Sequence, residues 1–185
     1  MFKYWKALCI AMIKNGFGGA KTQTGLRFEK RIDISALFKK LKGYYVQKEN
    51  ILFNGEKVAE LYKKHGFYKK FLETKGIVWK EVLSKQLLPD QVVFVVNSGI
   101  IYVVEIKFQV VEGSVDEKLQ TCDFKKKHYE KLVAPLNLKV EYAYVLNDWF
   151  KDARYKDTLN YIKSVSCHYF FNELPLKFLG LPLSK

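Results

Sequence analysis

Cysteine is scarce in this sequence, and its three copies are unpaired. Cys9, Cys122 and Cys167 lie far apart, and no CxxC pair occurs among the 185 residues. A zinc site or a disulfide framework is therefore not expected, and a reducing, cytoplasmic setting is favoured. Proline (4) and glycine (11) are also few, which argues against a collagen-like or disordered chain. No apolar run approaches the roughly 20 residues that cross a bilayer, so we expect no membrane partner.

Acidic residues are the minority charge. The chain has 32 Lys and Arg against 19 Asp and Glu, a net charge of +13, which favours a polyanionic partner. Arginine is rare as well: only Arg27, Arg31 and Arg154 occur, which leaves 29 lysines. Lysine makes point-charge contacts better than bidentate contacts to base edges. The balance thus favours contacts to a phosphate backbone, although a generally lysine-rich proteome would give the same composition.

Hydrophobic periodicity predicts one α/β domain with a three-layer arrangement. The Asn97-Ser98-Gly99 turn between two apolar runs is a strong hairpin signal. Both runs are apolar on both faces, as expected for central strands of a sheet that helices cover on each side. The predicted elements are a helix over 26–41, short strands over 44–47 and 51–53, a helix over 58–72, strands over 92–96 and 100–108, a helix over 116–133, a strand over 139–146 and a polar helix over about 148–163.

Charge interrupts the second hairpin strand, where the pattern calls for apolar residues. Glu105 and Lys107 point to the same face, because side chains alternate along a strand. If Val95 pairs with Ile100 through a four-residue loop, the register sets Asp90 opposite Glu105, and a three-residue loop would shift that pairing by one position. Two carboxylates and an amine then converge at the open end of the hairpin. Buried charges need partners or a metal, so the alternatives are a structural salt bridge and a metal site.

A divalent cation would neutralise the repulsion between Asp90 and Glu105. Mg²⁺ suits this pair, because it accepts a few carboxylate oxygens together with water and phosphate, and the Ile106 carbonyl is a further candidate ligand. Lys107 would lie where it can orient or deprotonate an attacking water and stabilise charge on a phosphate. The residues therefore predict metal-assisted hydrolysis of a phosphodiester.

Pro89-Asp90 followed by Glu105-Ile106-Lys107 resembles the PD-(D/E)xK signature of restriction-endonuclease-like nucleases. The resemblance covers roughly 25–146. It implies an α/β fold of the restriction-endonuclease-like type, with a mixed central sheet flanked by helices on both faces. It also implies a single nuclease domain over 1–185, with 42–88 as an inserted DNA-recognition or helical segment. The implied cofactor is Mg²⁺, for which Mn²⁺ can substitute.

Two more positions resemble looser motifs of the family. Glu29 resembles the acidic residue that many members place at the metal site, and a solvated carboxylate paired with Lys30 or Arg31 is the alternative. Gln120 resembles the polar residue that some members add beside the lysine. Tyr129 follows on the same predicted helix, at a spacing that suits core packing equally well.

Contacts to DNA are expected from two groups of residues. One is the glycine-rich loop that carries Lys21, Thr22 and Thr24, because glycine permits close approach of backbone N–H groups to phosphate. The other comprises Lys125 and Lys126 on the predicted helix after the hairpin. A flexible connector and a solvated helix face are the respective alternatives. His65, His128 and His168 fall on separate predicted elements, which disfavours a histidine metal site.

Within this family, a compact chain of this kind most resembles a type II restriction endonuclease. That implies a homodimer acting on double-stranded DNA in a bacterial or phage cytoplasm, with a separately encoded methyltransferase. Arg154, Asn147 and Asp148 are then candidates for base contacts. One alternative is a structure-selective nuclease, such as a junction resolvase or repair enzyme, which the scarcity of arginine favours. The other is a non-catalytic DNA-binding module on the same fold.

Overall fold

The computed structural model describes residues 33–183, which build a seven-stranded mixed sheet and several helices. Each strand lies beside its neighbour in sequence, in the order β1-β2-β3-β4-β5-β6-β7. Pairing is antiparallel from β1 through β5 and parallel from β5 to β6 and from β6 to β7. The expected α/β class with a mixed sheet is confirmed. The strands are β1 (Tyr44–Gln47), β2 (Asn50–Phe53), β3 (Glu56–Tyr62), β4 (Gln91–Val95), β5 (Ile100–Lys107), β6 (Lys139–Leu146) and β7 (His168–Phe171).

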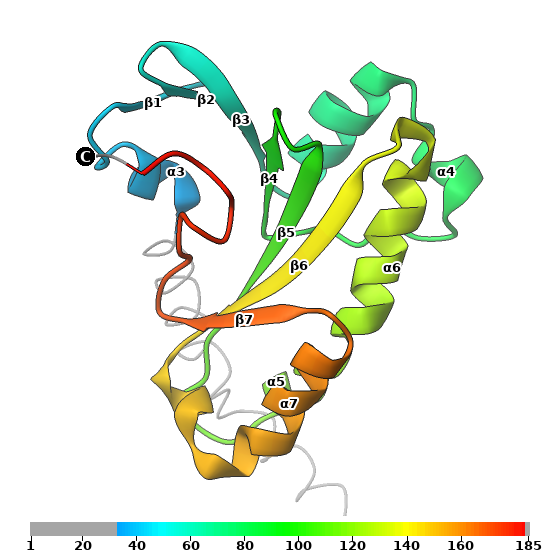
Figure 1. Ribbon diagram of the computed structural model, residues 1–185. Helices are drawn as coiled ribbons and strands as arrows, with labels where there is room; N and C mark the ends of the chain where they lie inside the picture. The colour runs from blue at the N-terminus through cyan, green and yellow to red at the C-terminus, as the bar shows by residue number, and fades with distance from the viewer. Residues whose placement is uncertain (1–32, 184–185) are drawn as a thin grey trace, which may run out of the picture.

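Helices and helical turns lie on both faces of the sheet (Figure 1). The α-helices are α3 (Ile34–Phe38), α4 (Trp79–Val82), α5 (Val115–Leu119), α6 (Cys122–Val133) and α7 (Lys156–Ser164). Shorter turns are η1 (Phe67–Leu72, π-helical) and the 3-10 turns η2 (Glu73–Lys75), η3 (Ala134–Leu136), η4 (Asp148–Lys151) and η5 (Ala153–Tyr155). Because a parallel pair needs a crossover, α5 and α6 fill the connection between β5 and β6. None of the described helices combines the length and the apolarity required to cross a bilayer.

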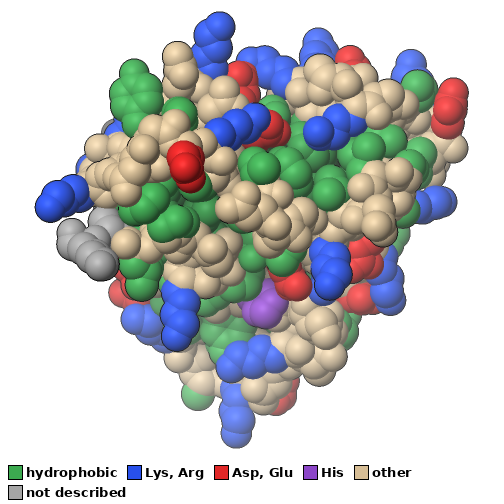
Figure 2. Space-filling model, turned by 45° about the horizontal axis from the view of Figure 1, so that its top comes forward, with side chains coloured by type: hydrophobic (Ala, Val, Ile, Leu, Met, Phe, Trp, Pro, Cys, Tyr) green, Lys and Arg blue, Asp and Glu red, His purple; other side chains and the backbone are tan. Residues whose placement is uncertain are grey.

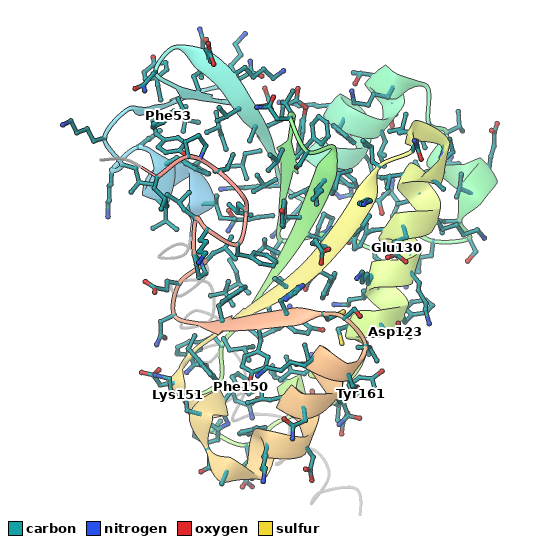
Figure 3. All side chains as sticks on the ribbon, viewed as in Figure 1. Phe53, Asp123, Glu130, Phe150, Lys151 and Tyr161 are labelled. Atoms are coloured by element: carbon teal, nitrogen blue, oxygen red, sulfur yellow. The ribbon has the colours of Figure 1, made fainter. Side chains whose placement is uncertain are left out.

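Alternation along β5 divides the interior into two cores. Ile101 and Val103 pack with α6 and η1 on one face, whereas Tyr102 and Val104 pack with α3 on the other. This is the pattern expected of a strand buried on both faces. By the same alternation, Glu105 belongs to the α6 face. Phe150 in η4 belongs to the α6-side core at the lower end of the molecule, where its ring contacts that of Tyr155 (Figure 3).

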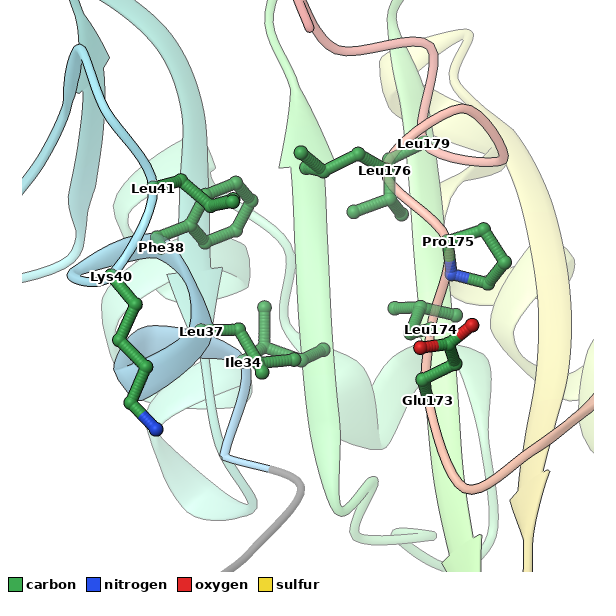
Figure 4. A pocket seen from close by; sticks show the side chains of 10 residues that line it. All are labelled: Ile34, Leu37, Phe38, Lys40, Leu41, Glu173, Leu174, Pro175, Leu176 and Leu179. Carbon is green, nitrogen blue, oxygen red and sulfur yellow. The ribbon is translucent and has the colours of Figure 1, made fainter. Parts of the chain in front are cut away.

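The second face is covered by α3 and by the non-helical C-terminal segment, residues 172–183 (Figure 1). Leu174, Leu179 and Leu181 of this segment are buried in the second core. Between α3 and this segment lies a mainly apolar groove of about 310 Å³, with Lys40 and Glu173 as its charged lining residues (Figure 4). The C-terminal segment thus acts as part of the covering layer.

Three predicted helices differ from the observed structure. The helix expected over 58–72 is wrong in its first half, because Val58–Tyr62 belongs to β3 and pairs with both β2 and β4; only η1 is helical. The helix expected over 116–133 is divided into α5 and α6 near Gln120. The polar helix after 148 begins as two 3-10 turns and becomes α-helical at Lys156.

The remaining predicted elements are found in the described part of the chain, except where they extend into residues 26–32. Strands expected over 44–47, 51–53, 92–96, 100–108 and 139–146 are confirmed to within a residue or so at each end. Of the helix expected over 26–41, residues 26–32 lie outside the described part, and α3 covers Ile34–Phe38. The segment 42–88 supplies β1, β2, β3 and the helical turns that follow them. Its role in DNA recognition stays a prediction.

Candidate active site

The β4–β5 hairpin places the signature residues at its open end. Val95 pairs with Ile100 and Gln91 pairs with Val104, which confirms the register predicted from a four-residue loop. Continuing this register by one residue sets Asp90 opposite Glu105. Asp90, at the N-terminal side of β4, and Glu105, near the C-terminal end of β5, therefore share the α6 face of the sheet.

Asp90 is tied to β5 through its side chain. Its Oδ2 accepts a hydrogen bond from the Ile106 N–H at 2.9 Å and lies 3.5 Å from the Lys107 Nζ. The Asp90 side chain is 20% exposed, so it remains partly accessible to solvent. The contact fixes the carboxylate against the strand that carries the other two signature residues.

Glu105 is the most buried member of the site. Its side chain is 7% exposed, and its Oε2 accepts hydrogen bonds from the Lys107 Nζ at 2.6 Å and from the Lys125 Nζ at 3.3 Å. Lys125 comes from α6, the helix packed on this face. The site therefore holds two carboxylates and two ammonium groups, and their formal charges cancel.

The electrostatics of the site keep Glu105 and Lys107 ionised. Burial disfavours the charged carboxylate of Glu105, but the positive charges of Lys107 and Lys125 outweigh it, so the pKa of Glu105 is lowered. Burial also disfavours the ammonium of Lys107, but Glu105 and Asp90 outweigh it, so its pKa is raised. At neutral pH, Lys107 in this state is an ammonium that orients and neutralises charge.

The oxygen donors present suit a hard divalent cation. Within residues 33–183, the hydrogen bonds and ion pairs of these carboxylates use Oδ2 of Asp90 and Oε2 of Glu105, which leaves Oδ1 and Oε1 for another partner. The same residues contain no group of three or more His, Cys, Asp or Glu side chains gathered for a metal. Two carboxylates still fit Mg²⁺, which keeps several waters and binds substrate phosphate.

The other predicted site residues are distributed as follows. Glu29, Lys21, Thr22 and Thr24 lie outside the described residues. Gln120 is exposed at the end of α5, where its backbone N–H donates to the Glu117 carbonyl. Among the described residues, no hydrogen bond or ion pair joins Gln120 to Asp90, Glu105 or Lys107. The structure thus does not bring Gln120 into contact with the signature residues.

The two lysines predicted to track a DNA backbone have different partners. Lys125 contacts Glu105, whereas the Lys126 Nζ donates to the Ser166 carbonyl at 2.9 Å and so ties α6 to the turn after α7. The role of Lys125 at the carboxylates was missed from the sequence. A signal was available, because Lys125 lies one turn before the inward-facing Tyr129 on the same helix.

Tyr129 lies in the core and is joined to the segment that leads into Asp90 through its hydrogen bond to Leu87. It is fully buried on α6, and its hydroxyl donates to the Leu87 carbonyl, three residues before Asp90. Tyr68 of η1 donates to the same carbonyl. The sequence did not single out Tyr68, because the spacing of a predicted helix does not reveal which acceptor a tyrosine hydroxyl on it meets.

Positive charge is spread over the face of the molecule seen in Figure 2. Lysine and arginine side chains are distributed around the face seen in Figure 2 and do not gather in one patch. Arg154 pairs with Glu112 and Asp152, and its guanidinium lies over the ring of Trp149. This cluster joins the loop after β5 to the turns after β6, near the C-terminal ends of both strands. A role for Arg154 in base contacts stays a prediction.

Comparisons with known proteins add no relative to this description. No protein-family model matches the chain, and neither a curated protein nor a solved structure matches it.

Proposed function

We propose that this chain is a Mg²⁺-dependent endonuclease that hydrolyses DNA phosphodiester bonds. The observation that carries the proposal is the convergence of Asp90, Glu105 and Lys107 on one face of the hairpin, with Oδ2 of Asp90 bonded to the amide between the other two residues. A salt bridge alone needs one acid and one base. Here two acids lie together, and no hydrogen bond or ion pair within residues 33–183 uses Oδ1 of Asp90 or Oε1 of Glu105, which suits the donor set of a metal-dependent hydrolase.

The topology around the hairpin supports a restriction-endonuclease-like assignment. Helix α3 precedes the sheet, five antiparallel strands (β1 to β5) follow, and α5 and α6 cross over to the parallel strand β6. This order accommodates the signature where the resemblance requires it: the first acid before β4, the second acid and the lysine at the end of β5.

The roles of the residues follow from their contacts. Asp90 and Glu105 would hold Mg²⁺ (or Mn²⁺), with the Ile106 carbonyl as a further ligand; when bound, the ion polarises the phosphate and lowers the pKa of a coordinated water. Lys107 binds the non-bridging oxygens of a phosphate and orients the attacking water. Lys125 neutralises Glu105 when no cation is present.

Double-stranded DNA is the proposed substrate, cut by a homodimer of the type II restriction class with a methyltransferase encoded separately. The net charge of +13 and the abundance of lysine support a polyanionic substrate. Arg154 is the sole arginine among residues 33–183, and its pairing with Glu112 and Asp152 leaves structure-selective cleavage as the competing substrate class.

Incubation of the full chain with long unmethylated duplex DNA tests the proposal. Cleavage is expected with Mg²⁺ and with Mn²⁺, and is expected to vanish with EDTA and in Glu105→Gln. Glu141→Gln is the matched control, because Glu141 also lies on a central strand but pairs with His168, and it should retain activity. Discrete fragments support a restriction enzyme, and cutting confined to branched DNA supports a resolvase or repair enzyme. Intact DNA under all conditions contradicts the proposal, and tight binding without cleavage would favour a non-catalytic module.

A further inference from the structure

We propose that Tyr68 and Tyr129 are positioning residues that jointly hold Asp90 in the site through the Leu87 carbonyl. The inference rests on the proposed function for its consequence in metal binding. Its structural core, the control of Asp90 by two tyrosine hydroxyls, can be measured without any metal.

Two hydroxyls meet on one backbone oxygen. The Tyr68 hydroxyl donates to the Leu87 carbonyl at 2.8 Å, and the Tyr129 hydroxyl donates to the same oxygen, also at 2.8 Å. The tyrosines come from different elements, η1 and α6, and they are 1% and 0% exposed. A carbonyl oxygen has two lone pairs, so these two donors saturate it.

The segment that receives these bonds has no regular structure of its own. Residues 83–90 lie between α4 and β4 and form neither helix nor strand. The Lys64 N–H donates to the Pro89 carbonyl at 2.9 Å, and Asp90 then accepts from the Ile106 N–H. The tyrosine contacts are therefore the first of three successive attachments that end at the Asp90 carboxylate.

The chemistry of the two phenols suits a permanent attachment. Burial raises the pKa of Tyr68 to about 12 and raises the pKa of Tyr129 well above its usual range, so both hydroxyls keep their protons and remain donors. Burial also fixes the two rings, because Phe67 contacts both at ring-centroid distances of 5.7 and 6.1 Å. Ring packing and hydroxyl bonding are thus separable by substitution to phenylalanine.

Shared donation predicts a non-additive response. With one hydroxyl removed, Leu87 retains its other donor, whereas removal of both leaves the oxygen without either tyrosine partner, which costs more than two single losses. We expect Tyr68→Phe and Tyr129→Phe each to loosen the hydrogen bond between Asp90 and the Ile106 amide, so that exchange of this amide accelerates about threefold. The double variant should accelerate it more than about tenfold.

Hydrogen exchange of the Ile106 amide, measured by NMR in EDTA, reports the position of Asp90 directly. We expect exchange to accelerate about threefold in each single variant and more than about tenfold in the double variant. Tyr44→Phe is the matched control, since the Tyr44 hydroxyl also donates to a backbone carbonyl, that of Pro182, on the opposite face. It should leave Ile106 exchange unchanged. Unchanged Ile106 exchange in folded single and double variants overturns the inference, and if the double variant does not fold, unchanged exchange in both single variants does so.

Mn²⁺ titration followed by EPR tests the consequence for the metal. The Mn²⁺ concentration at half-saturation should rise about tenfold in the double variant and stay constant in Tyr44→Phe, and kcat should fall while KM for DNA is kept. Failure of the wild-type chain to bind Mn²⁺ or cleave DNA would contradict the proposed function, while accelerated Ile106 exchange would still support the tyrosine attachment. Normal metal binding in a double variant with faster Ile106 exchange would overturn the link to the metal.

Discussion

Glu105 shows how a carboxylate stays charged in a nearly closed site. Its 7% exposed side chain would be costly to ionise alone, and two ammonium groups compensate for the lost water. Removing the carboxylate leaves Lys107 with Asp90 as its acidic contact among the described residues, at 3.5 Å. The site is therefore a coupled set in which each charge depends on its neighbours.

The lowered pKa of Glu105 predicts a specific acid response. The ordinary value is 4.5, and the folded value is lower, so the stabilising contribution is complete above about pH 4.5 and is lost as the pH falls through the folded pKa. We expect urea unfolding in EDTA to show a steeper loss of stability below pH 4.5 in the wild-type chain than in Glu105→Gln. At pH 7 the variant should be less stable by about 3 kcal/mol. Equal acid slopes in the two proteins would contradict this assignment, and Glu141→Gln serves as the control.

The position of Lys125 predicts that its ammonium group competes with a metal ion for the Glu105 carboxylate. It occupies Oε2 of Glu105, so Lys125→Met removes a positive charge from the carboxylate pair. We expect Mn²⁺ affinity without DNA, measured by EPR, to increase roughly tenfold. Lys126→Met is matched in helix and chemistry, but its ammonium bonds the Ser166 carbonyl, so it should not change Mn²⁺ affinity. Tighter binding in neither variant, or in both equally, would refute the competition.

The elements that sequence analysis predicted well are those with one dominant period. Both hairpin strands followed from their apolar content, and Glu105 and Lys107 followed from charge inside an apolar strand. The register was left open by one position, because a loop of three or of four residues was allowed, and the pairing of Val95 with Ile100 decides for four. The region 58–72 failed for a physical reason. Val58, Ala59, Leu61 and Tyr62 satisfy a helical spacing as well as a strand, and pairing with β2 and β4 decides between them.

Contacts across the fold could not be predicted, because they depend on how elements pack. The approach of Lys125 to Glu105 and the convergence of Tyr68 and Tyr129 on Leu87 join residues 19 to 42 positions apart. Periodicity assigns such side chains to the inner face of a helix, but it does not specify which polar atom they meet.

The turn between β4 and β5 requires a residue that tolerates a positive φ at position 99. Gly99 has a φ of +64°, and a Cβ at this position would meet Leu138 only at ordinary contact distance. Strain rather than crowding therefore determines the effect of Gly99→Ala, which should lower the free energy of unfolding by about 1 kcal/mol. Gly99→Asn should recover much of that loss, because asparagine tolerates this region. Gly66→Ala, at a negative φ with open space, is the control, and urea denaturation measures all three.

At the scale of the molecule, one of the two cores depends on a segment without regular structure. Within the C-terminal segment, Leu179 is buried in the second core at 2% exposure, whereas Leu183 is 65% exposed. We expect Leu179→Ala to lower the free energy of unfolding by about 2 to 4 kcal/mol and Leu183→Ala to change it by less than about 0.5 kcal/mol. Chemical denaturation checks the pair. Similar effects from both would show that the segment does not close the second core.

The unbroken strand order has a consequence for how the chain acquires its site. Every strand pairs with the strand next to it in sequence, but the connections differ in length. Short loops join β1 to β2, β2 to β3 and β4 to β5, whereas the long segments 63–90, 108–138 and 147–167 join the other neighbouring strands and cost more entropy to close. Asp90, Glu105 and Lys107 lie within a single hairpin, and hairpins close in about 1–10 μs. We expect the acids and the lysine to meet early in folding, before α6 and β6 arrive to enclose them.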